Sequence, residues 1–549
     1  MTRLLLIGIN ARYTHSNPAI RYLRNFCRAL PVQIELIEFS INQSTDEMLA
    51  AIHTSSPDLA AFSVYIWNSR IIATLLPDIR KILPDTRLIL GGPEVSYQPD
   101  FWLTRHPEID NIICGAGEGA LYDLLSSPEY PRTKIIPARP VPFELIPFPY
   151  LKEDFPDLNN KYIYYEASRG CPFRCSYCLS SREDQQLETR SWDKIRQELE
   201  ELNRRDIRIV KFVDRSFNAR AETARLIWEY LLNGDNQIKY HFEINAELLE
   251  DEDFAILARV PPEKFQFEIG IQSTNPATLQ EVNRPVNWQK LSVNIRKVIA
   301  LRNIRVHVDL LAGLPYDDYA SICRAIDQVW SLEADYLQLG FLKVLSGTRI
   351  HEKAEDYQLL FQASPPYEIL SNRWLDFSEL RRLKGIETAI NLLYNSGNFL
   401  RTLQETGRFY RSPVTFLERF TEFSRQIGTE NGKLQWWDAA SLLIEFLKSE
   451  FPGTAELWTD LLRWDWCQLA NSHYYPELLA STELIEVKKR YYSDLKRIID
   501  TEPLYSGRDC RQAIFFTTEN DILKKKLLEG NQVAAFLGRV RHKSIIYLN

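Results

Sequence analysis

Cysteine is scarce and scattered in this sequence. Only eight cysteines occur in 549 residues, and five of them stand alone: Cys27, Cys114, Cys323, Cys467 and Cys510. This distribution excludes the disulfide framework of a small secreted domain. It predicts reduced thiols and a cytoplasmic protein.

Long apolar runs are also missing. No run reaches the roughly 20 residues that a membrane-spanning helix needs, so we expect no membrane contact. The apolar start "RLLLIGI" (3–9) is followed at once by the polar "NARYTH". Because it lacks the long apolar segment and the cleavage site of a secretion signal, this start predicts a first strand.

An excess of basic charge is absent too. Lys and Arg number 66 against 73 Asp and Glu, and the net charge is −7. We therefore expect no extended surface for nucleic acid. The hydrophobic fraction of 45 % and the charged fraction of 25 % are those of an ordinary folded protein. The length exceeds what one hydrophobic core supports, which predicts about three domains.

Residues 1–136 alternate short apolar runs with segments of helical period. Continuous apolar runs are typical of strands buried on both faces of a parallel sheet, with amphipathic helices covering them. The runs are 3–9, 32–39, 58–66, 86–92 and 109–115. This pattern predicts a doubly wound, Rossmann-like domain, whose ligands lie beyond the carboxyl ends of the strands.

Six prolines between residues 137 and 156 interrupt the pattern and predict an ordered linker over 137–160. A second alternating series follows over 161–370, and we expect a partial (β/α)6 barrel of the TIM type there. The expected strands are 162–168, 207–214, 239–246, 264–272, 303–313 and 334–345. Residues 371–549 carry long helical patterns and predict a mainly α-helical domain, ending in a short sheet.

Three further cysteines, Cys171, Cys175 and Cys178, stand together in "GCPFRCSYC", in the loop after the first strand of the second series. An odd number cannot form a closed disulfide set, and structural zinc usually takes four ligands. Three thiolates can instead hold three irons of a 4Fe–4S cluster and leave the fourth iron open. This spacing and position favour a cluster over zinc or a purely structural role.

This loop, at the start of a six-unit βα series, strongly resembles that of the radical S-adenosylmethionine (SAM) superfamily. The resemblance implies that the three cysteines bind the cluster and that SAM chelates the open iron. It implies that SAM is cleaved reductively to a 5′-deoxyadenosyl radical. Matches in "FVDRSFN", "FEIGIQS" and the Asn-Arg that follows imply further SAM contacts, namely Tyr177, Asp214, Glu268, Gln272 and Arg284. The alternative for Asp214 and Glu268 is a helix cap or a salt bridge.

The first domain resembles the cobalamin-binding domain of cobalamin-dependent radical SAM enzymes, because "GGPEVS" and "GAGEGAL" follow its fourth and fifth expected strands. The resemblance implies cobalamin contacts from Ser63, Gly91, Gly92, Pro93, Glu94, Gly115, Gly117 and Glu118. The D-x-H-x-x-G motif, whose histidine coordinates cobalt in many cobalamin enzymes, is absent. His15 is the histidine nearest this crevice and contacts cobalamin or substrate, or is satisfied within its own loop. A domain that has lost its cofactor is the alternative.

The resemblance implies a radical SAM enzyme, most often one that transfers a methyl group to an unactivated carbon. Its alternative is a cobalamin-dependent cyclase of the anaerobic tetrapyrrole type. A tRNA methylthiotransferase would need three more cysteines in the first domain, and a non-catalytic sensor would need no SAM site. The expected partners are a small-molecule substrate and an electron donor such as flavodoxin or ferredoxin. No catalytic residue can be named from the sequence.

Overall fold

The computed structural model describes residues 2–127, 131–181, 186–234, 237–428, 434–470, 475–501, 506–538 and 543–549. The chain forms two compact units. The first unit comprises residues 1–325, 332–334 and 339–380, and the second, called the helical unit below, comprises 326–331, 335–338 and 381–549. None of the described helices combines the length and apolar character that crossing a bilayer requires.

The first unit begins with a parallel six-stranded sheet in the order β2-β1-β3-β4-β5-β6. Its strands are β1 (Thr2–Asn10), β2 (Val32–Ser40), β3 (Leu59–Ser63), β4 (Arg87–Gly91), β5 (Asn111–Cys114) and β6 (Ile135–Pro137). This confirms the predicted Rossmann-like sheet. The short edge strand β6 was not predicted, because three residues ending at a proline give no usable pattern.

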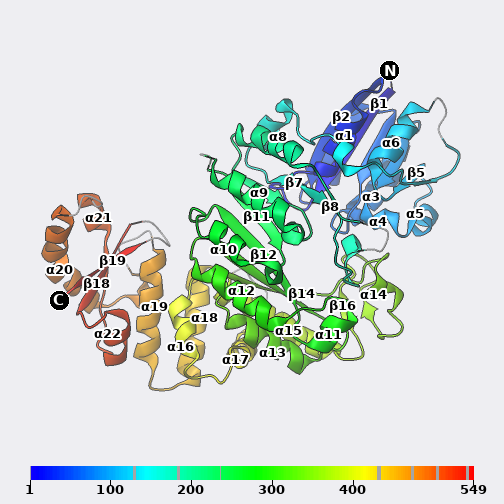
Figure 1. Ribbon diagram of the computed structural model, residues 1–549. Coiled ribbons are helices and arrows are strands. Elements are labelled where there is room, and N and C mark those ends of the chain that lie inside the picture. The colour runs from blue at the N-terminus through cyan, green and yellow to red at the C-terminus, as the bar shows by residue number, and fades with distance from the viewer. Residues whose placement is uncertain are drawn as a thin grey trace. The chain divides into compact units, whose positions relative to one another are not determined.

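Helices lie on both faces of this sheet (Figure 1), and both faces are buried, as the continuous apolar runs predict. Leu4 and Leu6 of β1 pack with residues of α1 (Pro18–Cys27) and α6 (Gly117–Ser126). Leu5 and Ile7 point the other way, toward α2 (Thr45–Ser55) and α3 (Ser69–Ile82). Successive side chains of one strand therefore serve two separate apolar layers. The short helices α4 (Pro93–Ser96) and α5 (Pro99–Arg105) follow β4.

A second six-stranded sheet has the order β14-β13-β12-β11-β10-β7. Its strands are β7 (Ile163–Tyr165), β10 (Ile209–Phe212), β11 (Lys239–Ile244), β12 (Phe265–Gln272), β13 (Arg305–Ala312) and β14 (Tyr336–Phe341). The pairs from β7 to β13 are parallel. The intervening helices are α8 (Trp192–Asn203), α9 (Ala221–Leu232), α10 (Asp251–Leu257), α11 (Pro276–Glu281), α12 (Trp288–Ala300) and α13 (Tyr319–Trp330). The predicted partial barrel is confirmed.

The chain leaves this sheet earlier than the sequence predicts. Strand β7 ends at Tyr165, and the next residues form β8 (Ser168–Arg169), which pairs with β9 (Glu188–Thr189) in a separate antiparallel ribbon. The Asp214 carboxylate accepts hydrogen bonds from the backbone N–H groups of Ala167 and Ser168. A side chain thus replaces the strand partner at this point, which a local pattern cannot reveal.

The helical unit, in yellow to red in Figure 1, confirms the predicted helical C-terminal part. Its helices are the end of α15 (Phe377–Ala389), a π-helical turn (Ile390–Tyr394), α16 (Leu400–Thr406), α17 (Pro413–Gln426), α18 (Trp436–Glu450), α19 (Ala455–Leu469), α20 (Thr482–Thr501), α21 (Gly507–Gln512) and α22 (Asp521–Leu527). It ends in an antiparallel sheet of β17 (Ile514–Phe516), β18 (Val533–Leu537) and β19 (Ser544–Leu548).

Candidate functional site

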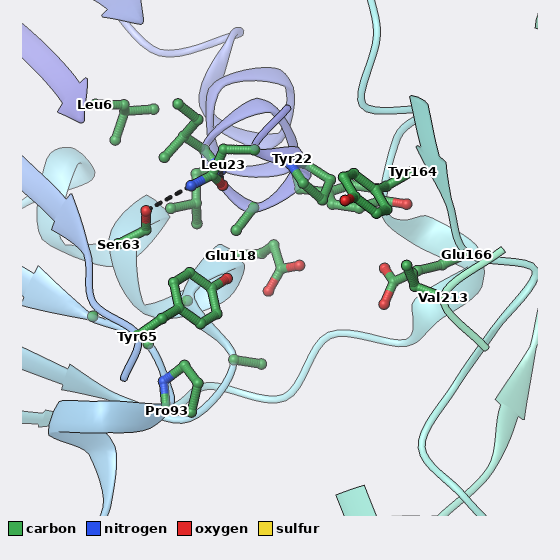
Figure 2. A pocket seen from close by; sticks show the side chains of 18 of the residues that line it. Leu6, Tyr22, Leu23, Ser63, Tyr65, Pro93, Glu118, Tyr164, Glu166 and Val213 are labelled. Carbon is green, nitrogen blue, oxygen red and sulfur yellow. Dashed lines mark hydrogen bonds between the residues drawn. The ribbon is translucent and has the colours of Figure 1, made fainter. Parts of the chain in front are cut away.

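A cavity of about 760 Å³ lies in the first unit at the carboxyl ends of β1, β3, β4 and β5 (Figure 2). One wall consists of these strand ends and the start of α1. The other wall comes from the second sheet and its loops, including Tyr164, Glu166, Arg169 and Arg215. Ligands of parallel sheets bind in this position, where the loops diverge around the strand ends.

The two glycine-rich loops form the cavity wall that the sequence predicts. Gly92 has φ +110° and ψ 171°, a region that only glycine adopts readily, and a Cβ there would stand 2.6 Å from the Val64 carbonyl oxygen. Gly115 has φ +92°, and its Cβ would meet the Ala138 side chain at 2.9 Å. Both positions therefore exclude a side chain, and only glycine fits these two turns beside the cavity.

All but one of the predicted cobalamin contacts line this cavity; those that do are Ser63, Gly91, Gly92, Pro93, Gly115, Gly117 and Glu118. Glu94 is not among its lining residues. Its carboxylate instead accepts a hydrogen bond from the Tyr367 hydroxyl at 2.5 Å, and burial raises its pKa. The structure thus assembles seven of the eight positions around one space.

Part of the cavity wall is polar. The Asn17 amide donates to the Ser63 hydroxyl at 2.8 Å, the hydrogen bond drawn beside Ser63 in Figure 2. The same Asn17 side chain accepts from the Ile20 backbone N–H and so caps α1. Both Asn17 and Ser63 are buried, so the cap also fixes the polar surface that a ligand would meet.

Two aromatic residues that the sequence analysis missed complete this wall. Tyr65 and Trp67 line the cavity and stack with ring centroids 4.3 Å apart and an interplanar angle of 6°. The Trp67 indole donates to the Ile9 carbonyl, yet 44 % of the residue stays exposed. An exposed tryptophan fixed by a hydrogen bond offers a flat apolar surface to a large ligand. The sequence feature that could have identified Trp67 was its position directly after the third expected strand.

His15 also lines the cavity, but its ring forms a hydrogen bond with a residue that is distant in the sequence. Its Nδ1 lies 2.7 Å from the Tyr164 hydroxyl, and Tyr164 belongs to β7 of the second sheet. Burial, and then the nearby Lys211 cation, lower the pKa of His15. The neutral imidazole therefore links the two walls of the cavity rather than closing on its own loop.

Arg169 makes the second link between the walls. Its guanidinium contacts Glu118 at 2.8 Å and Glu166 at 2.9 Å, and it lies over the rings of Tyr22 and Phe143. Glu118, Tyr22 and Glu166 surround the cavity in Figure 2. Arg169 stands two residues before Cys171, so this ion pair connects the cavity directly to the cysteine loop.

The cysteine loop is a turn that holds three free thiols. Cys171 and Cys175 are buried and Cys178 is half-buried. The Cys178 N–H donates to the Cys175 carbonyl at 3.1 Å, which closes the turn between the last two cysteines. Burial raises the pKa of Cys171, and the two other cysteines are among the charges that act on it. The three side chains therefore lie within electrostatic reach of one another.

Among the described residues, no three His, Cys, Asp or Glu side chains converge closely enough to hold a single metal ion. Four ligands at about 2.3 Å from one zinc ion would place neighbouring sulfurs about 3.8 Å apart. A 4Fe–4S cluster binds each thiolate at a different iron and so accepts a wider spacing. Three thiols in one loop match the Cys ligands that such a cluster takes.

Two of the predicted SAM contacts lie at this loop. The Arg284 guanidinium donates to Cys175 Sγ at 3.6 Å and to the Gly270 carbonyl at 2.5 Å. Tyr177 also hydrogen-bonds to Cys175, and burial raises the pKa of its hydroxyl. Donors to a ligand sulfur stabilise its negative charge and tune the bound cluster.

Asp214 lies at the segment that leads into the loop. It is 2 % exposed, and Oδ1 accepts from both the N–H and the hydroxyl of Ser168 at 2.5 Å. Burial raises its pKa to about 7, although these hydrogen bonds lower it. Asp214 does not line the main cavity, and its visible function is to hold residues 167 and 168 ahead of the cysteines.

The segment "FEIGIQS" contains a bulge in β12. The register to β13 shifts between Gly270 and Gln272, and Gln272 has φ +70°. A Cβ on Gly270 would stand 2.3 Å from Gln272 Nε2, so the glutamine amide covers the glycine. The bulge thereby exposes the Gly270 carbonyl to Arg284.

Glu268, the remaining predicted SAM contact, belongs to a row of ionisable residues on the face of the second sheet that does not carry the aromatic core. Glu268 contacts His241 Nε2 at 3.0 Å, which lowers the pKa of Glu268. The aromatic core on the opposite face includes Phe212, Phe242 and Phe267. The row, called the polar face below, consists of Lys211, His241, Glu243, Glu268, His307 and Asp309, which lie on four adjacent strands.

Charge and burial shift the groups of the polar face. Burial, together with Glu268 and Glu243, raises the pKa of Asp309 to about 8. Burial and Arg305 lower the pKa of His307 to about 4. At neutral pH Asp309 is thus largely protonated and His307 neutral, so both can donate hydrogen bonds. Most of this row was not predicted, although polar and apolar residues alternate visibly in "KYHFEI" and "RVHVDLLA".

Comparison with known proteins identifies three matching families along the chain. Residues 4–125 match the family described as "B12 binding domain", and residues 165–329 match the "Radical SAM superfamily". Residues 355–514 match a family described as "Protein of unknown function (DUF4080)".

The chain is similar to 2-(S-pantetheinyl)-carbapenam-3-carboxylate methyltransferase of Streptantibioticus cattleyicolor, with 26 % identity over 49 % of this chain and 44 % of the relative. It is also similar to the cobalamin-dependent radical SAM methyltransferase TokK of Streptomyces tokunonensis, with 25 % identity over 55 % of this chain and 50 % of the relative. The chain thus spans about half the length of these two relatives.

Solved structures of the same fold include the cobalamin-dependent SAM radical enzyme OxsB, with a TM-score of 0.59 and 15 % identity over 93 % of this chain and 82 % of that one. Another is the radical SAM methyltransferase TsrM of Kitasatospora setae, with a TM-score of 0.56 and 16 % identity over 68 % and 82 %. Residues of the B12-binding match and of the radical SAM match both line this cavity. With the DUF4080 match that follows them in the chain, they show that the chain belongs to the cobalamin-binding radical SAM family.

Proposed function

We propose that the chain is a cobalamin-dependent radical SAM enzyme that transfers a methyl group to an unactivated carbon of a small-molecule substrate. The observation that carries this proposal is the cavity at the strand ends of the first sheet. Its second wall is the segment that leads into the cysteine loop, so the cobalamin and cluster sites would share one border. The methyltransferase names of both relatives support the same reaction.

The residues assigned to each cofactor follow from this arrangement. Cys171, Cys175 and Cys178 would hold a 4Fe–4S cluster, and the glycine loops with Tyr65 and Trp67 would hold cobalamin. Tyr177, Asp214, Glu268, Gln272 and Arg284 stay the proposed contacts for SAM. When bound, these groups supply reductive cleavage of SAM to a carbon radical and a methyl donor for the substrate.

The chain itself would exclude water, orient the substrate and manage protons. The polar face offers Lys211 as a cation and the Asp309 carboxyl and neutral His307 as hydrogen-bond donors, with Glu243 and Glu268 as acceptors. A substrate that carries polar groups would match the polar character of this surface. The enzyme would take electrons from a small protein such as flavodoxin or ferredoxin.

The experiment is anaerobic reconstitution of the full chain with iron, sulfide, SAM and hydroxocobalamin. We expect a cluster absorption band, 5′-deoxyadenosine after reduction, and cobalamin that survives desalting. Cys171→Ala should lose the deoxyadenosine and keep the cobalamin, whereas Cys323→Ala, a half-buried thiol on α13, should keep both. A wild-type chain without deoxyadenosine would refute the catalytic proposal, and loss of cobalamin on desalting would refute the cobalamin assignment.

A radical cyclase is the second candidate. The chain is 24 % identical, over 39 % of its length, to the anaerobic magnesium-protoporphyrin IX monomethyl ester cyclase of Synechocystis. The cavity of about 760 Å³ is also large enough to receive part of a macrocycle. Methylated product from labelled SAM distinguishes methyl transfer from cyclisation, because only methyl transfer moves the label into the substrate.

A further inference from the structure

The segment that follows the last strand of the second sheet contacts both the first sheet's loops and the cysteine loop. We call residues 342–371 the strap; it contains α14 (Arg349–Glu352) and an antiparallel pair of β15 (Leu360–Phe361) and β16 (Ile369–Ser371). The whole strap belongs to the first unit, and none of its residues lines the cavity of that unit. The DUF4080 match begins at residue 355, within the strap.

The strap is anchored on the second sheet and on the cysteine loop. The Leu342 N–H donates to the Ala312 carbonyl at 2.9 Å, and the Ile369 N–H donates to the Leu342 carbonyl at 2.9 Å. Both ends of the strap are therefore fixed where β13 ends. From there α14 reaches the cysteine loop, where the Ile350 N–H donates to the Ser176 carbonyl at 3.0 Å.

The strap also touches the segments that follow β3 and β4 of the first sheet. The Arg70 guanidinium, on α3, donates to the Ser364 hydroxyl at 2.5 Å. Gly347 lies against the Tyr97 ring: it has φ +85°, and a Cβ there would stand 2.4 Å from Tyr97 Cγ. Only a glycine permits this close approach.

A third contact, between Tyr367 and Glu94, is buried. Glu94 is 6 % exposed, and its carboxylate accepts from the Tyr367 hydroxyl at 2.5 Å. Burial raises the pKa of Glu94, and this hydrogen bond lowers it. Tyr367 has φ +57°, a conformation that is uncommon for a large side chain. Such strain persists where the surrounding contacts fix it, and it is often found at functional sites.

Glu94 belongs to α4, the short helix that joins the two glycine loops. The Ser96 hydroxyl of this helix donates to the Gly92 carbonyl at 2.8 Å and accepts from the Gly115 N–H at 3.0 Å. Pro93, the first residue of α4, borders the cavity in Figure 2. The position of α4 therefore determines the position of both glycine loops.

We propose that Tyr367 is a positioning residue for the cobalamin cavity: its bond to Glu94 holds α4, and through α4 both glycine loops, in place relative to the cysteine loop. The inference rests on the proposed function, because it concerns the cavity assigned to cobalamin. Tyr367 does not line that cavity and acts through Glu94. Without this bond, α4 and the glycine loops lose a fixed link to the second sheet.

The test compares Tyr367→Phe with the matched control Tyr357→Phe in the full-length chain. Tyr357 also belongs to the strap, and its hydroxyl donates to the Glu281 carboxylate on α11. Both variants thus remove a hydroxyl that donates to a carboxylate, but only Tyr367 contacts α4.

The first measurement is hydrogen exchange of the chain without cofactors. We expect the amides of residues 92–98 and 113–117 to exchange about fivefold or more faster in Tyr367→Phe and at the wild-type rate in Tyr357→Phe. If Tyr367 only stabilised the strap, exchange would rise within residues 342–371 and not in the glycine loops. Wild-type exchange in the glycine loops of Tyr367→Phe would overturn the proposal.

The second measurement is equilibrium binding of hydroxocobalamin. Its affinity should fall about fivefold or more in Tyr367→Phe and stay within about twofold of wild type in Tyr357→Phe. Unchanged or tighter binding to Tyr367→Phe would overturn the proposal. A wild-type chain that binds no hydroxocobalamin would instead refute the proposed function, and the exchange rates decide the role of Tyr367 in either case.

A double variant tests whether Tyr367 acts through Glu94. We expect Glu94→Leu to weaken hydroxocobalamin binding as Tyr367→Phe does, and Tyr367→Phe/Glu94→Leu to weaken it no more than the more damaging single change. Two residues that act through one hydrogen bond give such non-additive losses. If the loss in the double variant equalled the product of the two single losses, the residues would act independently and the proposal would be wrong.

Discussion

At the scale of single residues, the cofactor cavity depends on backbone conformations that only particular side chains allow. Gly92 and Gly91 are adjacent, yet they differ in what they require. Gly92 has positive φ and no room for a Cβ, whereas a Cβ on Gly91 would meet its nearest atom, the Ile113 carbonyl oxygen, at 3.8 Å. Comparing substitutions at these two positions therefore separates the effect of backbone strain from the effect of replacing a glycine.

We expect Gly92→Ala to lower the free energy of unfolding by about 2–4 kcal/mol, because it combines backbone strain with a clash against Val64. Gly91→Ala should change it by less than about 1 kcal/mol. Chemical denaturation of both variants measures the difference. Retention of hydroxocobalamin after desalting should fall for Gly92→Ala only. Equal stability of the two variants would contradict the strain at position 92.

His307 makes the stability of the first unit depend on pH. Its pKa is lowered to about 4, first by burial and then by Arg305, while an unfolded histidine has a pKa of about 6.5. The folded chain thus binds the proton more weakly than the unfolded chain does. The contribution of neutral His307 is complete above about pH 6.5 and is lost as the pH falls toward 4.

We therefore expect the melting temperature of wild type to fall more steeply than that of His307→Gln between pH 6.5 and pH 4.5. His53→Gln, which replaces an exposed histidine on α2, should follow wild type. Differential scanning fluorimetry across this range measures the three slopes. Parallel curves for wild type and His307→Gln would mean that the buried imidazole does not govern this window.

At the scale of elements, the local sequence pattern predicted where the strands lie. It failed where contacts between distant segments decide where a strand ends. The continuous runs of β1 and β3 and the alternating run of β12 appear at their predicted places. The end of β7 at Tyr165 was missed, because the Asp214 side chain from a segment 49 residues later takes the backbone donors. The glycine loops were found because tight turns restrict residue type.

The walls of the site also include residues that local sequence predicted and residues that only tertiary contacts reveal. Trp67 and, apart from Glu268, the residues of the polar face were not predicted as ligand surfaces, since an aromatic or charged side chain in a strand pattern is usually core or solvated surface. Their function depends on which strand lies next to which, as His307 faces Glu268 only through the pairing of β12 and β13. Sequence order alone does not give such neighbours.

Helix α1 gives a prediction at this scale. Its cap Asn17 is buried and also donates to Ser63, whereas Asn287, the cap of α12, is exposed and its side chain accepts from Lys290 N–H. We expect Asn17→Ala to cost about 2–3 kcal/mol and Asn287→Ala about 1 kcal/mol. Urea unfolding of both variants measures these costs. A smaller loss for Asn17→Ala would show that the Ser63 contact contributes nothing.

At the scale of the whole molecule, the boundary between the units does not follow the order of the chain. Residues 326–331, at the end of α13, group with the helical unit. Asp327 accepts from the Val414 N–H at the start of α17, and Trp330 packs against Tyr394 at 4.5 Å. The helical unit is therefore completed by residues that come 50 positions before its main segment.

We expect a chain truncated after residue 380 to aggregate, because Trp330 and Val329 would lose the helical unit around them. The same truncation with Trp330→Ser and Val329→Thr should be more soluble. Size-exclusion chromatography of both truncated chains measures this. A monodisperse truncated chain without these substitutions would show that the helical unit is dispensable for the first.

The ion pair of Arg169 with Glu118 connects the cavity wall of the first sheet with the segment that leads into the cysteine loop. Arg169 touches the cobalamin cavity through Glu118 and stands two residues before the first cluster ligand. Any ligand that shifts Glu118 therefore also acts on the cysteine loop, and by thermodynamic reciprocity the filled loop changes the affinity of the cavity by the same factor. Under the proposed assignment of the two cofactors, loading either one would change the affinity for the other by the same factor, whichever is loaded first.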